Sequence, residues 1–203
     1  MKAVHISDTH GTFPKLPKDA EAVLHTGDFC PNFIVTDHEM EAHLQRDWLK
    51  REQWTIKKWL GGRTMLVVQG NHDFTIISCE GVIDITNRRY EFGGVSFYGF
   101  PWVPAFGPWN WGANEHEMFE RVNRIPWGNI DVLMAHCPPH SVLDFCPSGH
   151  IGNNQLSNAI IEHGDNLPKW LLCGHVHEQG GGINGYRTMT ILNNATTQRV
   201  ITL

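Results

Sequence analysis

Five times along this chain of 203 residues, a short apolar run ends in a cluster of polar side chains. The run over residues 64–69, for example, leads directly into Gly70-Asn71-His72-Asp73. Short apolar runs rich in β-branched residues are typical of buried strands, and ligand sites in α/β sheets gather beyond the carboxyl ends of the strands. We therefore expect five clusters to meet at one place: Asp8-Thr9-His10, Gly27-Asp28, Gly70-Asn71-His72-Asp73, Ala135-His136 and Gly174-His175-Val176-His177.

Nine apolar runs are predicted strands. They cover residues 3–7, 22–25, 64–69, 82–85, 95–100, 132–135, 170–173, 188–192 and 199–203. A long helix is predicted between the second and third runs, where Thr36 and Glu39 fit a capping box and Gly61-Gly62 ends the pattern. The apolar face expected for this helix consists of Met40, Leu44, Trp48, Ile56 and Leu60. Further helices are predicted over residues 114–124 and 153–163.

The order of these elements predicts an α/β protein. Short strands that are apolar without interruption and alternate with helices indicate a sheet buried on both faces. A hairpin at Gly93-Gly94 and a strand-rich C-terminal part indicate a second, partly antiparallel sheet packed on the first. A layered αββα sandwich of two mixed β-sheets flanked by helices satisfies both patterns, and we expect residues 1–203 to form a single domain.

Composition restricts the class of partner. A formal net charge of −5 disfavours a protein that binds long nucleic acid, whereas a small anionic substrate at a metal site remains compatible with it. No apolar stretch approaches the roughly 20 residues that a membrane span needs, and no cleavable leader precedes the first predicted strand. The five cysteines lack CxxC spacing, which argues against a zinc ribbon and a disulfide framework. We expect a cytoplasmic protein.

The polar clusters contain a ligand set for divalent metal ions. It comprises the carboxylates Asp8 and Asp28, the amide Asn71, and the imidazoles His10, His136, His175 and His177. Oxygen and nitrogen ligands without thiolate suit Mn²⁺, the ion we expect, and also Fe, Zn, Ni or Co, better than Ca²⁺. Seven side chains are too many for one ion but fit two ions that share a bridging carboxylate. Such a centre keeps a net positive charge and attracts phosphate oxygens.

In this order and over almost the whole chain, the clusters resemble the calcineurin-like metallophosphoesterase superfamily. Further stretches are similar to its small metallophosphoesterase-domain (class III phosphodiesterase-like) branch, whose members hydrolyse phosphodiesters. These stretches are Gly27-Asp28-Phe29, residues 98–104 (YGFPWVP) and His136-Cys137-Pro138-Pro139.

The resemblance implies a role for each site residue. One metal would be held by Asp8, His10, Asp28 and His177, and the other by Asp28, Asn71, His136 and His175, with Asp28 bridging. His72 would contact the scissile phosphate and protonate the leaving alkoxide, while Asp73 would orient its ring or raise its basicity. The implied activity is hydrolysis of small phosphodiesters, including cyclic nucleotides, by in-line attack of metal-bound hydroxide.

Three alternatives to this function stay open at this point. The substrate could be a phosphomonoester, as for protein phosphatases. The chain could instead be a metal-binding scaffold without activity, although no ligand or proton donor is missing from the pattern. A nuclease acting on DNA is disfavoured by the acidic balance of charge. The partner we expect is a small phosphoester.

Substrate contacts are predicted from two further features. His150 follows the His136 cluster closely enough to reach a bound phosphate, although a local structural role explains it equally well. Phe100 and Trp102 open an aromatic stretch that continues through Phe106, Trp109 and Trp111. These rings could stack against a nucleobase or an aryl group, or they could close the core or a subunit contact.

Overall fold

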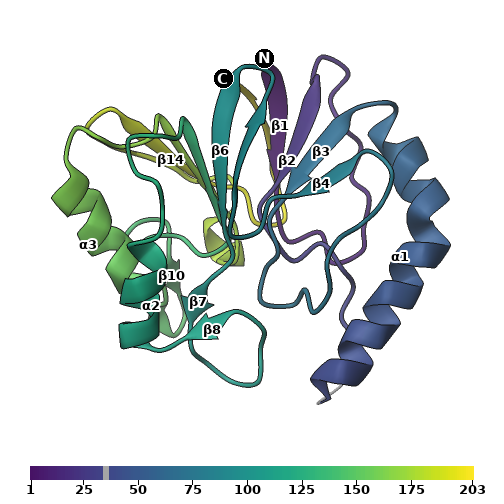
Figure 1. Cartoon of the computed structure of the whole chain (residues 1–203), viewed down its shortest axis with the longest axis horizontal. Helices are drawn as coiled ribbons and strands as arrows, with labels where there is room; N and C mark the ends of the chain where they lie inside the picture. Colours follow the sequence, from purple (N-terminus) through teal and green to yellow (C-terminus); the bar gives the residue numbers. More distant parts are fainter. Residues whose placement is uncertain (34–36) are drawn as a thin grey trace.

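The first of two large sheets contains the predicted strands from the N-terminal third of the chain (Figure 1). The computed structural model describes residues 1–33 and 37–203. The strand order in this sheet is β15–β1–β2–β3–β4. Its members are β1 (Lys2–Ile6), β2 (Ala22–His25), β3 (Thr64–Val67), β4 (Val82–Asp84) and β15 (Gln198–Thr202). All pairs are parallel except β1 with β15, so one antiparallel strand closes an otherwise parallel sheet.

The second large sheet has the order β13–β14–β12–β9–β6–β5. Its members are β5 (Arg89–Phe92), β6 (Val95–Phe100), β9 (Val132–Ala135), β12 (Trp170–Cys173), β13 (Ile183–Tyr186) and β14 (Met189–Asn193). The central pairs are parallel, and β5 and β13 join the two edges in antiparallel orientation. The β5–β6 hairpin turns at Gly93-Gly94, as predicted. Both sheets are therefore mixed.

Two short strand pairs and a single helical turn lie in the segments that connect the larger elements. Their members are β7 (Val103–Pro104) with β8 (Gly112–Ala113), β10 (Phe145–Cys146) with β11 (Gly149–His150), and the 3₁₀ turn η1 (His177–Gln179).

Three apolar clusters fill the spaces between four layers. The strands alternate between them: on β3, Met65 and Val67 pack toward the helix α1 (His38–Leu60), whereas Leu66 belongs to the cluster between the two sheets. The third cluster joins the second sheet to α2 (Glu115–Val122) and α3 (Asn154–His163). Strands buried on both faces explain why these segments appear as continuous apolar runs in the sequence. The predicted αββα sandwich is confirmed (Figure 1).

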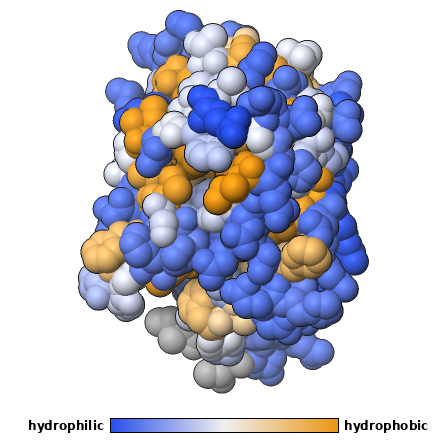
Figure 2. Space-filling view, turned by 90° about the vertical axis from the view of Figure 1, so that its left-hand side faces the viewer, coloured by the Kyte–Doolittle hydropathy of each residue, from blue (hydrophilic) through white to orange (hydrophobic). Residues whose placement is uncertain are grey.

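Each helix begins at a side chain that accepts backbone N–H groups. Asp37 accepts from the backbone of Glu39 and Met40 at the start of α1. Asn114 forms a capping box with Glu117 in α2, and Asn153 caps α3. The predicted cap Thr36 lies outside the described residues. The face of the molecule that α2 and α3 form is mainly hydrophilic, with separate hydrophobic side chains among the polar ones (Figure 2).

The buried face of α1 differs from the prediction. Met40 is 48% exposed, and Glu41 and Gln45 are buried instead. The Gln45 side chain donates to the carbonyl of His72 (2.6 Å) and accepts from the backbone N–H of Phe74 (2.8 Å). Hydrogen bonds to loop backbone compensate the burial of polar groups, which an apolar periodicity does not reveal. The helix α1 thus holds the loop that follows β3.

No helix in the described part of the chain combines the length and the apolar character needed to cross a bilayer.

Candidate metal centre

The polar clusters that follow five strands of the two sheets come together at one place. The first sheet contributes the residues that follow β1, β2 and β3, and the second contributes those that follow β9 and β12. The structure brings together all seven side chains of the predicted ligand set, namely Asp8, His10, Asp28, Asn71, His136, His175 and His177. The centre therefore bridges the two sheets.

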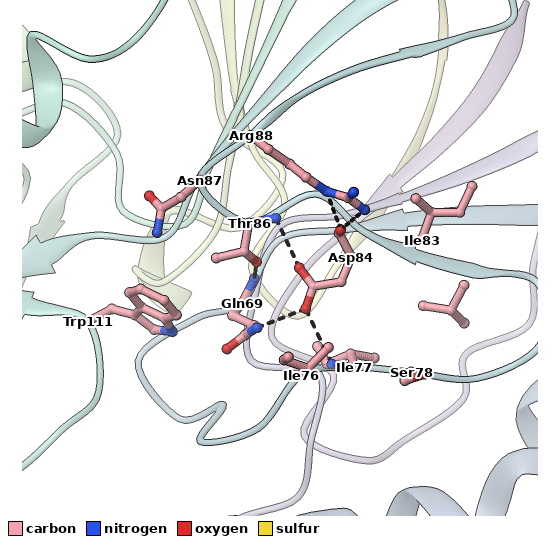
Figure 3. Close-up of a pocket in the computed structure, with 11 residues that line it drawn as sticks. Gln69, Ile76, Ile77, Ser78, Ile83, Asp84, Thr86, Asn87, Arg88 and Trp111 are labelled. Carbon is pink, nitrogen blue, oxygen red and sulfur yellow. Dashed lines mark hydrogen bonds between the residues drawn. The ribbon is translucent and has the colours of Figure 1, made fainter.

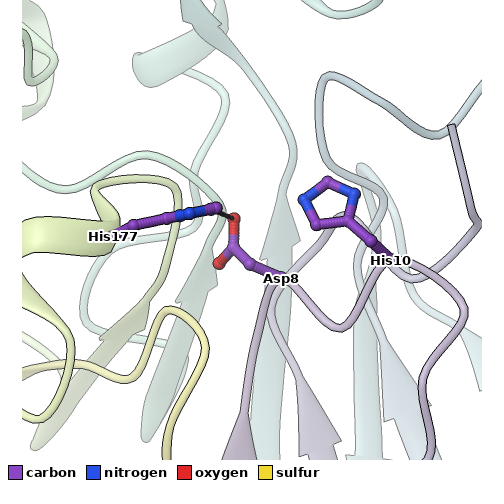
Figure 4. A group of neighbouring side chains, drawn as sticks. All are labelled: Asp8, His10 and His177. Atoms are coloured by element: carbon purple, nitrogen blue, oxygen red, sulfur yellow. Dashed lines mark ion pairs between the residues drawn. The ribbon is translucent and has the colours of Figure 1, made fainter. Parts of the chain in front are cut away.

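One group of candidate ligands consists of Asp8, His10 and His177 (Figure 4). One ligand atom from each lies within 4.8 Å of the others. Nε2 of His177 is 3.4 Å from Oδ1 of Asp8, and the backbone N–H of His175 donates to Oδ2 of Asp8 at 2.9 Å. A side chain at Gly174 would overlap both Oγ of Ser7 and this carboxylate. Glycine is therefore required for the segment 174–177 to approach Asp8.

A second group consists of Asp8, Asp28 and His136, again with ligand atoms within 4.8 Å of one another. Nε2 of His136 lies 3.5 Å from Oδ1 of Asp28 and 3.0 Å from Oδ1 of Asn71. Its Nδ1 lies 2.8 Å from the carbonyl oxygen of Thr26, which accepts the Nδ1 proton. This hydrogen bond fixes the tautomer, so Nε2 faces the carboxylates as a potential ligand atom.

The two oxygens of Asp28 face different histidines. Oδ2 is 3.8 Å from Nε2 of His10, which belongs to the first group, and Oδ1 is 3.5 Å from Nε2 of His136 in the second. Asp28 is 2% exposed, so its carboxylate cannot swing into solvent. Asp28 thus lies between the two groups of candidate ligands.

The backbone of the centre is held in sparsely populated conformations. Positive φ values occur at Asp8 (55°), His10 (43°), Asp28 (57°) and His175 (66°). Non-glycine residues in this region cost about 1–3 kcal/mol each and persist only where their surroundings fix them. Here the segments that follow β1 and β2 continue to bond to each other, through Asp8 N–H to the Gly27 carbonyl and His10 N–H to the Asp28 carbonyl, both at 2.9 Å.

Burial and charge together set the protonation of the centre. Burial opposes ionisation of Asp28, but the facing His136 outweighs it and holds the pKa of Asp28 well below its ordinary value. Conversely, burial disfavours imidazolium at His136, but the charge of Asp28 raises its pKa to about 9. A hydrogen bond to Asp8 raises the pKa of His177, whereas burial lowers that of His175 to about 4. In the metal-free protein, protons on histidine balance the buried carboxylates.

These residues fit divalent cations. Among the described residues, the ion pairs of Asp8 and Asp28 involve histidine and neither lysine nor arginine. The ion-pair partners of the two buried carboxylates are thus all titratable and can release their protons when a cation binds. The donor atoms are carboxylate oxygens, an amide oxygen and imidazole nitrogens, a set that suits Mn, Fe or Zn.

His72 lies beside the ligand groups, but Asp73 does not orient it. The rings of His72 and His10 are 5.2 Å apart, and burial lowers the pKa of His72. The Asp73 carboxylate instead accepts from the backbone N–H groups of Cys30 (2.8 Å), Gly70 (2.9 Å) and Phe29 (3.2 Å). The expectation that Asp73 orients the His72 ring is therefore wrong. Its carboxylate has a different task, which is to tie the loops after β2 and β3 together.

The structure places the predicted substrate-contacting residues outside the ligand groups. Phe100 is 1% exposed within the apolar cluster beneath α2 and α3, so the expected substrate contact is wrong and its ring closes the core. Trp102 donates to Oδ1 of Asn87 at 2.9 Å and packs edge-on against Trp111.

His150 belongs to a local hydrogen-bond network after β9. Its Nδ1 lies 2.6 Å from Oδ1 of Asp144, and Oδ2 of the same carboxylate accepts from the backbone N–H groups of Ser141 and Gly152. These contacts correspond to the local structural role. Its predicted contact with phosphate stays a prediction.

Two other members of the aromatic stretch, for which the sequence left substrate stacking and packing open, touch the centre. The ring of Trp109 lies 4.2 Å from that of His72, and the ring of Phe106 lies 5.8 Å from that of His175. Their contacts depend on the course of the loop between β7 and β8, which residue spacing does not give.

A cavity of about 530 Å³ lies beside the end of β3 (Figure 3), and none of the candidate ligands is among the residues that line it. Its lining includes Asp84, whose carboxylate accepts from the Gln69 side chain (2.8 Å) and from the backbone of Thr86 (2.9 Å) and Ile77 (3.3 Å). Asp84 thus joins the side chain of Gln69, the residue before Gly70, to the backbone around Ile77 and Thr86.

Two relatives and one solved structure resemble the chain over most of its length. Probable rhamnogalacturonate lyase C of Emericella nidulans is 26% identical over 200 residues, which cover 87% of this chain but only 17% of that protein. UPF0046 protein C25E10.12 of Caenorhabditis elegans is 26% identical in an alignment 226 residues long. The alignment covers 96% of this chain and 75% of that protein. The crystal structure of phosphopantetheinyl hydrolase (PptH) from Mycobacterium tuberculosis shares the fold, with a TM-score of 0.54 and 14% identity over 96% of this chain and 89% of that chain.

A family model decides the classification. The model described as calcineurin-like phosphoesterase matches residues 1–179. This range contains every residue of the ligand groups together with His72. The chain therefore belongs to the calcineurin-like phosphoesterase family.

Proposed function

We propose that this protein is a phosphodiesterase that uses two divalent metal ions, with Mn²⁺ as the preferred ion. The observation that carries the proposal is the position of Asp28, whose two carboxylate oxygens face His10 on one side and His136 on the other. A single ion has no need of a carboxylate directed at two separate groups of ligands. A pair of ions sharing Asp28 uses both oxygens.

The side chains divide into two ligand sets on this proposal. The first consists of Asp8, His10, Asp28 and His177, and the second of Asp28, Asn71, His136 and His175. When bound, the ions would supply Lewis-acid stabilisation of phosphate oxygens and lower the pKa of a coordinated water.

His72 is the proposed proton donor to the leaving alkoxide. Its ring lies beside that of His10 and, within the described residues, forms no ion pair with Asp8 or Asp28. Its backbone N–H donates to the carboxylate of Asp28 at 2.8 Å. Burial lowers its pKa in the free protein, and a bound phosphate anion nearby would favour the imidazolium form that donates a proton. Gln45 and Asp73 hold the backbone around it.

The substrate we propose is a small phosphodiester, with cyclic nucleotides included, and the location is the cytoplasm. The formal net charge of −5 supports a small substrate over long nucleic acid. Buried Cys30, Cys137 and Cys173 are free thiols in the structure, as expected in a reducing compartment.

The test is turnover by the protein after reconstitution with Mn²⁺. We expect hydrolysis of bis(p-nitrophenyl) phosphate to exceed that of p-nitrophenyl phosphate, and Asp28→Ala to abolish both. Metal analysis of the reconstituted protein should give two ions per chain. Absence of turnover with Mn, Fe, Zn, Ni and Co alike would refute the proposal, and a preference for the monoester would assign the protein to the phosphomonoesterases.

A further inference from the structure

Two exposed aromatic rings border the metal centre. Trp109 is 38% exposed and its ring lies 4.2 Å from that of His72, at an interplanar angle of 43°. Phe106 is 46% exposed and its ring lies 5.8 Å from that of His175. His72 and His175 follow strands of different sheets, so one loop places an aromatic surface on each half of the centre.

This loop is attached to the segment that carries His72. The backbone N–H of Asn110 donates to the carbonyl of Asn71 at 3.0 Å, and its side-chain amide donates to the carbonyl of Asp73 at 2.6 Å. Nε2 of His38 on α1 lies 2.6 Å from the carbonyl oxygen of Pro108. Pro108 stands between Phe106 and Trp109 in the sequence. These bonds fix the loop relative to the centre, so the rings have a defined position without substrate.

Core packing does not account for the two rings. The other aromatic side chains of the same stretch are partners in packing: Phe100 lies in the core, and Trp102 packs against Trp111 and under the guanidinium of Arg121. Trp109 and Phe106 instead leave more than a third of their surface exposed, next to buried charged groups. Their place beside the centre distinguishes them from other exposed rings, because a ligand that reaches the centre would cover their apolar surface.

We propose that Trp109 and Phe106 form the platform that binds a flat aromatic group attached to the phosphate of the substrate. This inference rests on the proposed function and narrows its substrate class to phosphoesters of nucleosides or aryl alcohols. Flat rings stack on aromatic side chains with little preference for the identity of the base, while the centre holds the phosphate. Since Trp109 touches the proposed proton donor, it lies on the side of the leaving group.

Equilibrium binding to the Mn²⁺-loaded protein tests this without relying on turnover. AMP and ribose 5-phosphate carry the same phosphate and ribose, so the ratio of their affinities isolates the base. From the worth of one base–aromatic stack, we expect AMP to bind about 5- to 150-fold more tightly in the wild type. Trp109→Ala should remove most of this ratio and leave ribose 5-phosphate affinity within about twofold, and Trp109→Phe should restore it.

Matched variants control for the loss of an aromatic side chain as such. Trp54→Ala removes a 70% exposed tryptophan from α1, and Phe119→Ala removes a 52% exposed phenylalanine from α2. Both should retain the wild-type ratio, whereas Phe106→Ala should reduce it. Phenyl phosphate and methyl phosphate form a second pair of ligands. If the affinity ratio of phenyl phosphate to methyl phosphate equals that of AMP to ribose 5-phosphate, the platform is assigned to aryl groups rather than nucleobases.

The outcomes separate this inference from the proposed function. Equal affinity of the wild type for AMP and ribose 5-phosphate would overturn the platform while leaving phosphate binding intact. An equal loss of both affinities in Trp109→Ala would also overturn it, because the ring would then only support the centre. If the wild type binds neither ligand, the proposed function fails and the platform fails with it.

Discussion

The backbone N–H of His72 donates a hydrogen bond of 2.8 Å to Oδ1 of Asp28. The proposed proton donor is therefore tied to the shared carboxylate through its main chain, and its imidazole is not needed for this bond. Asn71, one residue earlier, reaches the centre through its side chain, with Oδ1 3.0 Å from Nε2 of His136. Two adjacent residues thus have separable tasks.

Replacing these two residues should affect rate and metal content differently. In His72→Ala the bond to Asp28 remains, so both ions should stay bound while kcat for phosphodiesters falls by about 10²- to 10⁴-fold, the usual worth of a general acid. Asn71→Ala should bind one ion more weakly. Metal analysis after dialysis and steady-state kinetics give both quantities. Loss of an ion from His72→Ala would show that His72 is a ligand.

Metal binding should release protons. The pKa of His136 is raised to about 9, so Nε2 is protonated at pH 7.5 and must lose its proton to become a ligand. Metal affinity should therefore weaken as the pH falls below about 9, by about tenfold per pH unit from this group alone. Calorimetric titration with Mn²⁺ in two buffers of different ionisation enthalpy measures the protons released. Identical heats in both buffers at pH 7.5 would contradict this assignment.

A methyl group at position 174 should disrupt the centre. In Gly174→Ala the new Cβ would overlap Oγ of Ser7 and Oδ2 of Asp8, which must then move. We expect a loss of about 1–3 kcal/mol in unfolding free energy and weaker metal binding. Gly185→Ala is the matched control, because a Cβ there meets no atom within 4 Å. Denaturant unfolding of both variants checks this, and equal stability would refute the requirement for glycine.

Two buried histidines should make the metal-free protein sensitive to acid. Burial lowers the pKa of His5 and of His25 to about 3 each. Because the unfolded chain takes up these protons near pH 6.5, the stabilising contribution is complete above that pH and is lost as the pH falls toward 3. In EDTA, the unfolding free energy of both proteins should fall as the pH is lowered from 6.5 toward 3. The slope for the wild type should exceed that for His5→Gln by about 1.4 kcal/mol per pH unit. Parallel curves would contradict the low pKa of His5.

The central strands are the part of the fold that sequence predicts best. The boundaries of β2, β6, β9 and β12 coincide with the predicted runs, because strands buried on both faces are mostly apolar. β13 was not predicted. Its residues Ile183, Asn184 and Gly185 are exposed, so its pairing with β14 leaves no apolar pattern in the sequence.

For the centre, residue types and chain order predict which side chains meet, but not what holds them. Two of the partners of Asp73 are backbone N–H groups of Phe29 and Cys30, more than 40 positions away along the chain. The contribution of Gln45 is similar, since a polar residue in an amphipathic helix is expected in solvent. Such contacts depend on the arrangement of loops in space, which local patterns do not determine.

The candidate metal centre takes Asp28 from one sheet and His136 from the other, so no single sheet fixes the gap between them. That gap depends on how thick the apolar layer between the sheets is, to which Leu66, Met134 and Leu172 belong. Side-chain volume in this layer therefore sets the separation between the two halves of the candidate centre. A change of one methylene there should shift the two halves of the centre relative to each other, and with them metal affinity and catalytic rate, although no ligand residue would be replaced.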